Sequence, residues 1–187
     1  MIISGLLTDD HDRLNEMFAG IFADFDAEDV EAVYRNLDFF WALLAVHIRA
    51  EHLRLFPQIL QAAELSDKTN SEGVPGIEYV RETIARLHSD HNYFMRELLS
   101  AIKQMRLLRG KGRTMNDGEL LAKARRNVEA VQKRLETHNE IEEKEVYLWA
   151  DLLFEGASGA DLREKIQKEL DNIPPRFAPE KDQEERP

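Results

Sequence analysis

Apolar residues recur along the chain at alternating spacings of three and four residues, in four separate segments. These segments run from Leu7 to Phe25, from Val30 to Leu55, from Val80 to Leu108 and from Leu121 to Leu152. Such spacing keeps the apolar side chains on one face of a helix, because an α-helix has about 3.6 residues per turn. The pattern therefore predicts four long helices that pack through their apolar faces.

Turn-forming residues separate these segments. An acidic turn at residues 26–29 follows the first segment, the stretch from Ser66 to Gly76 is rich in Ser, Asn, Gly and Pro, and two glycines near residue 110 follow the third. These residue types favour turns, and short connections make neighbouring helices antiparallel. We therefore expect an all-α fold, an up-down-up-down four-helix bundle with a kink at Pro57. We recognise no internal repeat and no strand-like alternation that would favour another fold.

The ends of the chain add detail to this fold. Thr8 and Asp9 are residue types that cap the exposed amides at the start of a helix. A short amphipathic helix is predicted from Ala160 to Leu170. Residues 1–173 would then form one helical-bundle domain. Residues 174–187 form an acidic segment with little apolar content, and we expect them to be a disordered tail.

Composition narrows the classes of function. The chain has no cysteine among its 187 residues, which excludes disulfides, iron–sulfur clusters and cysteine nucleophiles. The formal net charge of −11 disfavours nucleic-acid partners, because lysine and arginine supply most of the affinity for phosphates. The N-terminus lacks the features of a secretory signal, and no apolar run reaches membrane-spanning length. We therefore expect a cytoplasmic protein with neither nucleic-acid nor membrane partners, and no protein partner is indicated.

Polar residues interrupt the apolar stripes only at a few positions that should face the core. These residues are His11, His47, Glu51, His91, His138, Glu142 and Glu145. Burying a neutral polar group without a partner costs roughly 2 to 7 kcal/mol, and burying a charge costs more. A shared cation would offset that cost, so the interruptions indicate a metal site inside the bundle.

The positions of the interruptions favour a site with two metals. Counted from the connecting turns, the four histidines lie at nearly the same height, within roughly 5 Å at 1.5 Å per residue. Glu51 follows His47 by four residues and Glu142 follows His138 by four, so each pair shares a helix face. This set gives two nitrogen ligands per metal and two bridging carboxylates, which suits iron or manganese, with zinc as an alternative. The predicted metal ligands are His11, His47, Glu51, His91, His138 and Glu142.

Other polar residues near these positions are given lesser roles. Glu143 should miss the metals unless the helix is locally distorted, so we expect it at the surface. Glu145 could contact a ligand histidine or lie at a partly exposed end of the bundle. His52 and His88 lie off the stripes and are predicted to be at the surface or beside a ligand. Tyr147 has no assignable role.

The motifs together are specific enough to indicate a family. They are His11-Asp12, His47-Ile-Arg-Ala-Glu51 followed by Leu55-Phe56-Pro57, Asp90-His91, and His138-Asn-Glu-Ile-Glu142-Glu143. Over roughly residues 5 to 155 the sequence resembles the hemerythrin family, specifically the bacterial hemerythrin-like branch with an HHE cation-binding domain. The resemblance implies a non-haem centre of two carboxylate-bridged iron ions that binds dioxygen, nitric oxide or related small oxidants.

The sequence departs from the family pattern at two places. The family often has a second glutamate after the His-x-x-x-Glu motif of the second helix, where this chain has His52. Oxygen-carrying members use His-x-x-x-His in the third helix, whereas His88 and His91 are three apart. The expected site therefore differs from that of the oxygen carriers.

These observations leave three functions open. The first is a di-iron binding protein that binds or senses oxygen or nitric oxide, or handles iron. The second is an enzyme that uses the centre as an oxidase or peroxidase or in iron–sulfur repair. The third is a zinc-bound or metal-free structural bundle that binds a protein partner. We favour binding of metal and a small ligand over enzymatic turnover and assign no catalytic residue.

Overall fold

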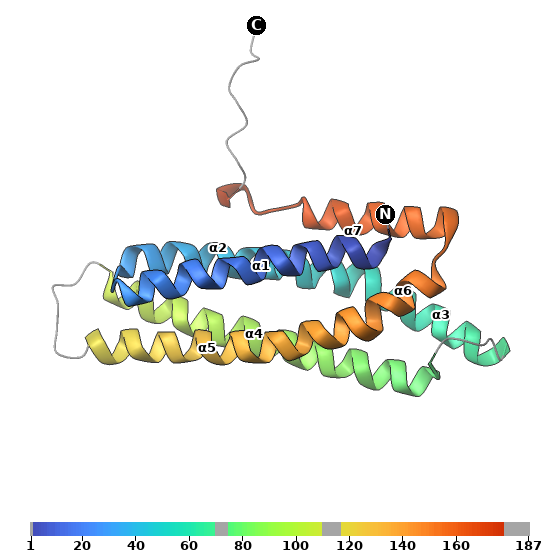
Figure 1. Cartoon of the computed structure of the whole chain (residues 1–187), viewed down its shortest axis with the longest axis horizontal. Coiled ribbons are helices and arrows are strands. Elements are labelled where there is room, and N and C mark those ends of the chain that lie inside the picture. Colours follow the sequence, from blue (N-terminus) through green and yellow to red (C-terminus); the bar gives the residue numbers. More distant parts are fainter. Residues whose placement is uncertain (1, 70–74, 110–116, 178–187) are drawn as a thin grey trace, which may run out of the picture.

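The chain is mostly helical in the computed structural model, which describes residues 2–69, 75–109 and 117–177. Within these ranges there is no β-strand. Figure 1 shows the long helices lying side by side in a bundle, with their axes along its length. The expectation of an all-α fold is therefore confirmed.

Four long helical segments build the bundle, and two of them contain a short π-helical turn. In chain order the elements are α1 (Ile3–Asp26), α2 (Val30–Ala50), the π-helical turn η1 (Glu51–Leu55), α3 (Phe56–Thr69), α4 (Ile77–Leu108), α5 (Asp117–Ile141), the π-helical turn η2 (Glu142–Val146), α6 (Tyr147–Leu153), α7 (Gly156–Leu170) and the 3₁₀ turn η3 (Pro175–Phe177). Contacts join α1 to α2, α2 to α4, α4 to α5 and α5 to α1, which closes the bundle around a common interior.

Two local predictions differ from the structure. Thr8 and Asp9 do not cap the first helix, because it begins earlier, at Ile3. Its first amides are held by α6 instead, where the Asp151 Oδ1 atom accepts hydrogen bonds from the Ile3 and Ser4 backbone nitrogens at 2.9 and 3.3 Å. The second helical segment was predicted to kink at Pro57, and the structure has the π-helical turn η1, which ends at Leu55, two residues before this proline.

The apolar core consists of two clusters with polar residues between them. One cluster includes Leu14, Leu44, Phe94 and Leu135, and the other includes Leu7, Ala50, Leu87 and Val146. On each long helix the two clusters occupy successive stretches of the buried face. The buried histidines lie between these stretches, so the packing of both clusters fixes the height of the polar layer.

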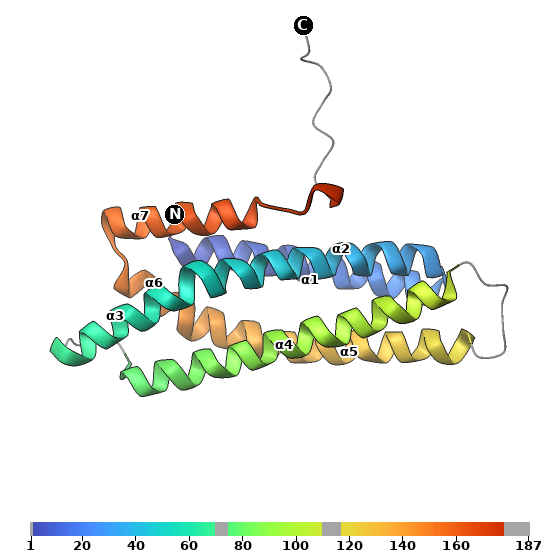
Figure 2. The ribbon, with the colours of Figure 1, turned by 180° about the vertical axis from the view of Figure 1, so that it is seen from behind.

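Helix α7 covers one side of the bundle. In Figures 1 and 2 it lies along the side formed by α1 and α2, with which it is in contact. Arg49 and Arg54 of the second helical segment donate hydrogen bonds to the Glu169 carboxylate, each at 3.0 Å from Nε. The start of α7 needs Gly159, because an added Cβ atom would lie 2.3 Å from the Phe154 carbonyl oxygen. The predicted C-terminal helix is therefore present and begins at Gly156.

The described residues after α7 make contacts with α2. Residues 175–177 form a 3₁₀ turn, Arg176 donates a hydrogen bond of 3.0 Å to Asp38, and the Phe177 ring lies 5.3 Å from that of Phe39. These contacts hold residues 175–177 against α2, although they lie in the segment 174–187 that we predict to be a disordered tail, and the limits of the domain stay a prediction. The rest of the predicted tail, residues 178–187, lies outside the described residues. Among the helices described, none has the length and apolarity needed to cross a membrane.

Candidate metal centre

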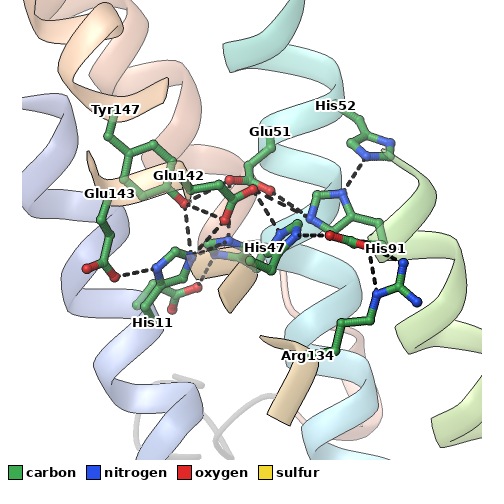
Figure 3. Close-up of polar contacts among 12 residues, drawn as sticks. His11, His47, Glu51, His52, His91, Arg134, Glu142, Glu143 and Tyr147 are labelled. Carbon is green, nitrogen blue, oxygen red and sulfur yellow. Dashed lines mark hydrogen bonds and ion pairs between the residues drawn. The ribbon is translucent and has the colours of Figure 1, made fainter. Parts of the chain in front are cut away.

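The six predicted metal ligands come together in the interior of the bundle. His11 comes from α1, His47 from α2, Glu51 from the start of η1 and His91 from α4, and Figure 3 shows their side chains pointing toward one another. The remaining two are His138, at the end of α5, and Glu142, at the start of η2. All six side chains are between 0% and 2% exposed. The layer between the two apolar clusters is thus a closed nest of imidazoles and carboxylates.

One half of this nest lies around His11 and His47. Their Nε2 atoms are 3.1 Å apart. The Glu142 Oε2 atom lies 3.3 Å from His11 Nε2, and the Glu51 Oε1 atom lies 3.5 Å from His47 Nε2. The four residues offer ligand atoms that all lie within 4.8 Å of one another. They therefore form one candidate metal position, called the His11/His47 position below.

The other half lies around His91 and His138. Glu142 Oε1 lies 3.0 Å from His138 Nε2 and 3.7 Å from His91 Nε2. Glu51 Oε2 lies 3.4 Å from His91 Nε2. This is the second candidate position, the His91/His138 position. Each carboxylate thus directs one oxygen to each position, which is the arrangement of a bridging ligand.

The polar atoms of the nest do not satisfy one another. Glu51 Oε2, Glu142 Oε1 and His91 Nε2 are buried and have no hydrogen-bond partner among the described residues. Buried polar atoms are almost always hydrogen-bonded or bound to an ion. Nitrogen and carboxylate oxygen are also the donor atoms that iron, manganese and zinc accept. The residues present therefore fit a pair of cations, which would satisfy the unpaired atoms.

Each histidine is oriented through the ring nitrogen that faces away from the nest. His47 Nδ1 lies 2.9 Å from Asp10 Oδ2, and His138 Nδ1 lies 3.3 Å from Asp90 Oδ2. Arg134 in turn donates a 2.7 Å hydrogen bond to Asp90. Metal-bound histidines usually have such a partner, which fixes the ring orientation and makes the imidazole more basic.

The other two histidines use partners of different chemistry. His11 Nδ1 lies 2.8 Å from Glu143 Oε1, and His91 Nδ1 lies 2.8 Å from His52 Nε2. The prediction that Glu143 is only a surface residue is therefore wrong, since one face of its side chain meets α1. His52 takes the role beside a ligand that was one of its two predicted alternatives. His88 lies one step further out, with its ring 4.0 Å from that of His52.

These contacts repeat between the two halves of the chain. Asp10-His11 on α1 corresponds to Asp90-His91 on α4, and His47-x-x-x-Glu51 corresponds to His138-x-x-x-Glu142. In both halves the aspartate binds the histidine of the His-x-x-x-Glu motif, and the residue after the glutamate binds the other histidine. The sequence therefore contains an internal repeat, contrary to our prediction. Its signal consists of these few residues and their contacts.

Both π-helical turns begin at the bridging glutamates. η1 starts at Glu51 and η2 starts at Glu142. A π-turn contains one more residue than an α-turn, and such turns are frequent at functional sites. In η2 the turn brings the Tyr147 hydroxyl 3.3 Å from Glu142 Oε2, across a spacing of five residues. Periodicity does not reveal this contact, so the sequence assigned Tyr147 no role.

Glu145 lies outside the nest. Its side chain is half-buried and accepts a 2.6 Å hydrogen bond from the Tyr79 hydroxyl. It therefore takes the second of its predicted alternatives, a partly exposed position at the end of the bundle.

Without a cation, the nest attracts protons. Burial works to lower the pKa of His138, but the charge of Glu142 and the hydrogen bond with Asp90 outweigh it and raise that pKa to about 9. Burial likewise opposes protonation of His47, yet Glu51 and Asp10 raise its pKa well above the ordinary value. Conversely, burial would raise the pKa of Glu142, but His138 and His11 hold it well below the ordinary value. The nest therefore favours positive charge between its carboxylates.

We predict that the metal-free protein loses stability as the pH rises from 7 to 9. A histidine whose pKa is raised by folding contributes stability that is complete below its unfolded pKa of 6.5 and is lost as the pH passes the folded pKa. For His138 the loss between pH 7 and 9 is on the order of 2 kcal/mol. His91 and His52 do not oppose it, since their pKa values are lowered and both are neutral above pH 7.

Denaturant unfolding of chelator-treated protein at several pH values measures this loss. The metal-loaded protein is the control, because its histidines are held unprotonated by the metal throughout the range. A metal-free protein whose unfolding free energy stays constant or rises from pH 7 to 9 would show that the nest does not hold protons as described.

Comparison with known proteins gives one match. The family model of the hemerythrin HHE cation-binding domain matches residues 3–150. No curated protein and no solved structure matches the chain. The matched range contains all six residues of the nest together with Asp10, Asp90 and both π-helical turns.

Proposed function

The chain belongs to the hemerythrin HHE cation-binding domain family, and from this premise we propose that it is a non-haem di-iron protein that binds a small diatomic ligand, oxygen or nitric oxide. His11 and His47 would hold one iron ion, and His91 and His138 the other. Glu51 and Glu142 would bridge the two ions. The proposal includes the up-down-up-down order of the four long helices, because segments adjacent in the chain are in contact.

The observation that carries this proposal is the division of the two carboxylates between the two histidine pairs. Glu51 directs Oε1 to His47 and Oε2 to His91, and Glu142 directs Oε2 to His11 and Oε1 to His138. One cation would leave half of these atoms unsatisfied. Two cations would use all four carboxylate oxygens and all four Nε2 atoms, which supports a pair of ions.

The surrounding residues suit a redox-active centre that binds a small ligand. A pair of iron ions, when bound, supplies open coordination positions and access to two oxidation states. The four histidines border a narrow space that is also lined by Leu14, Leu44, Leu135 and Asn139. These leucines put apolar side chains against the nest, so bulk water and large molecules are excluded from it.

The alternatives differ in the metal and in what it does. A metal-free structural bundle is disfavoured because three buried polar atoms of the nest lack partners. Zinc or manganese would satisfy the same atoms, and an oxidase, a peroxidase or an iron–sulfur repair enzyme would use the same iron centre. A cytoplasmic location and the absence of nucleic-acid partners stay predictions.

Metal analysis of freshly purified protein tests the proposal. We expect two iron ions per chain and an optical spectrum that changes on exposure of the reduced protein to oxygen or nitric oxide. Stoichiometric zinc with no spectral response would refute the di-iron assignment and favour the structural alternative. Catalytic turnover of a peroxide or of oxygen, rather than reversible binding, would identify an enzyme.

We predict that Asp90→Asn weakens iron binding on the order of 10- to 100-fold, the usual effect of removing the partner of a ligand histidine. The amide oxygen accepts the hydrogen bond from His138 Nδ1 less strongly than a carboxylate does, and the variant also loses the ion pair with Arg134. Competition with a chromogenic chelator measures the change. Asp12→Asn is the matched control, since Asp12 is adjacent to His11 but exposed, and equal affinities of the two variants would contradict the assigned role of Asp90.

A further inference from the structure

The Tyr147 hydroxyl lies inside the His11/His47 position. Its oxygen is 2.8 Å from Glu51 Oε1, 3.0 Å from His11 Nε2 and 3.3 Å from Glu142 Oε2. Tyr147 is 0% exposed. Figure 3 shows the ring entering the nest from α6, with its hydroxyl among these three side chains. The phenol oxygen therefore faces three of the four side chains that define this position.

The internal repeat shows that the hydroxyl is not required for packing. Tyr147 follows Glu142 by five residues, and the residue that follows Glu51 by five is Phe56. Phe56 is also buried, and its ring stacks 6.2 Å from that of His91, as the Tyr147 ring lies 5.4 Å from that of His11. A ring alone thus fills the equivalent place in the other half. The oxygen of Tyr147 is a feature of the His11/His47 position only.

The Tyr147 hydroxyl cannot form favourable hydrogen bonds with all of its neighbours. A phenol has one hydrogen to donate, and Tyr147 faces two carboxylate oxygens, one on Glu51 and one on Glu142. One of the two contacts therefore brings oxygen lone pairs together inside a water-free site, which is costly. A cation placed among the phenol oxygen, the carboxylates and His11 would turn every one of these contacts into an attraction.

We infer that the Tyr147 oxygen is an additional ligand of the metal ion at the His11/His47 position. This inference rests on the proposed di-iron function. Coordination replaces the phenol O–H bond by an oxygen–metal bond, and the proton is released to solvent, as for other protonated ligands. The ion at the His91/His138 position meets Phe56 instead and receives no such oxygen. The two ions therefore differ, and the small ligand binds at the His91/His138 ion, which has fewer protein ligands.

Resonance Raman spectroscopy of the ferric wild-type protein tests this inference. A phenol oxygen on ferric iron produces a visible charge-transfer band, and excitation in that band enhances the vibrations of the tyrosine ring. We expect these vibrations in the wild type and their complete loss in Tyr147→Phe. Phe56 shows that phenylalanine fits the equivalent place, so the variant should fold. Tyr79→Phe, which removes the exposed hydroxyl bonded to Glu145, is the control and should keep the vibrations.

The outcomes separate this inference from the proposed function. Wild-type protein that holds two iron ions but shows no tyrosine vibrations would overturn the role of Tyr147 and leave the di-iron centre standing. Tyrosine vibrations that persist in Tyr147→Phe would do the same. Wild-type protein that binds no iron would refute the proposed function itself. Loss of the vibrations in Tyr147→Phe, with one or both iron ions retained, supports the inference.

Discussion

Glu142→Gln is expected to lower the affinity for both iron ions by at least about 100-fold. Loss of a residue that only hydrogen-bonds to a metal ligand costs up to about 100-fold, and loss of a ligand should cost at least as much. Both candidate positions depend on Glu142, because its two oxygens lie 3.3 Å from His11 Nε2 and 3.0 Å from His138 Nε2. The amide keeps the shape of the side chain but removes its negative charge and one acceptor oxygen. Iron per chain after gel filtration should fall from about two toward zero, since one ion loses a ligand oxygen and the other keeps at most a neutral amide oxygen.

Glu140→Gln is the matched control for this experiment. Glu140 lies on α5 two residues before Glu142, is 66% exposed and pairs only loosely with Lys144 at 3.5 Å. Its replacement should leave the iron content unchanged. If Glu142→Gln retained both ions with wild-type affinity, the bridging role of this carboxylate would be wrong.

Removal of iron by a chelator is expected to lower the thermal unfolding midpoint by on the order of 10 °C. A ligand that binds only the folded state stabilises it by about 4 kcal/mol when present at 1,000 times its dissociation constant. One kcal/mol corresponds to about 2–4 °C for a chain of this size. The nest supplies a physical reason for a large effect, because the metal-free protein keeps Glu51 Oε2 and His91 Nε2 buried without hydrogen-bond partners among the described residues. Scanning calorimetry with and without the chelator measures the shift.

His47→Ala gives the matched test of that prediction. His47 is fully buried, so the variant also loses packing, and its midpoint will be lower for both reasons. The informative quantity is the difference between the unfolding midpoints with and without the chelator, which should be much smaller in the variant than in the wild type. A chelator effect of wild-type size in His47→Ala would mean that the stabilising metal binds elsewhere.

The convergence of the six residues was predictable because helix periodicity and height along a bundle are both encoded locally. His11, His47, His91 and His138 each interrupt an apolar stripe, and a polar residue on such a stripe is placed in the core by its apolar neighbours. The counting of residues from each turn then brings them to one layer. No knowledge of long-range contacts is needed for either step.

Features that depend on contacts between distant segments were not predictable in the same way. The first helix begins at Ile3 because Asp151, from the far end of the chain, accepts from its first amides, whereas local residue types indicated Thr8 and Asp9. The contact of Glu143 with His11 likewise joins α1 to η2. The contact of residues 175–177 with α2 likewise depends on a distant residue, because Arg176 donates a hydrogen bond to Asp38.

The π-helical turns are a further reason why part of the site was not predicted from the sequence. A stripe counted at 3.6 residues per turn loses its phase where a turn holds an extra residue. Tyr147 lies directly after such a turn, and its contact with Glu142 spans five residues. The repeat of Asp-His and His-x-x-x-Glu in both halves is a signal that could have identified Tyr147. It aligns Tyr147 with Phe56, which directly follows the other π-helical turn.

X-ray diffraction from crystals of iron-loaded protein, with anomalous differences recorded at the iron edge, tests the central claim most directly. Two anomalous peaks per chain are predicted. One should lie among His11 Nε2, His47 Nε2 and the carboxylates of Glu51 and Glu142, and the other among the same carboxylates and the Nε2 atoms of His91 and His138. A single peak outside this nest, or none in protein that carries iron, would contradict the assignment of a two-metal centre.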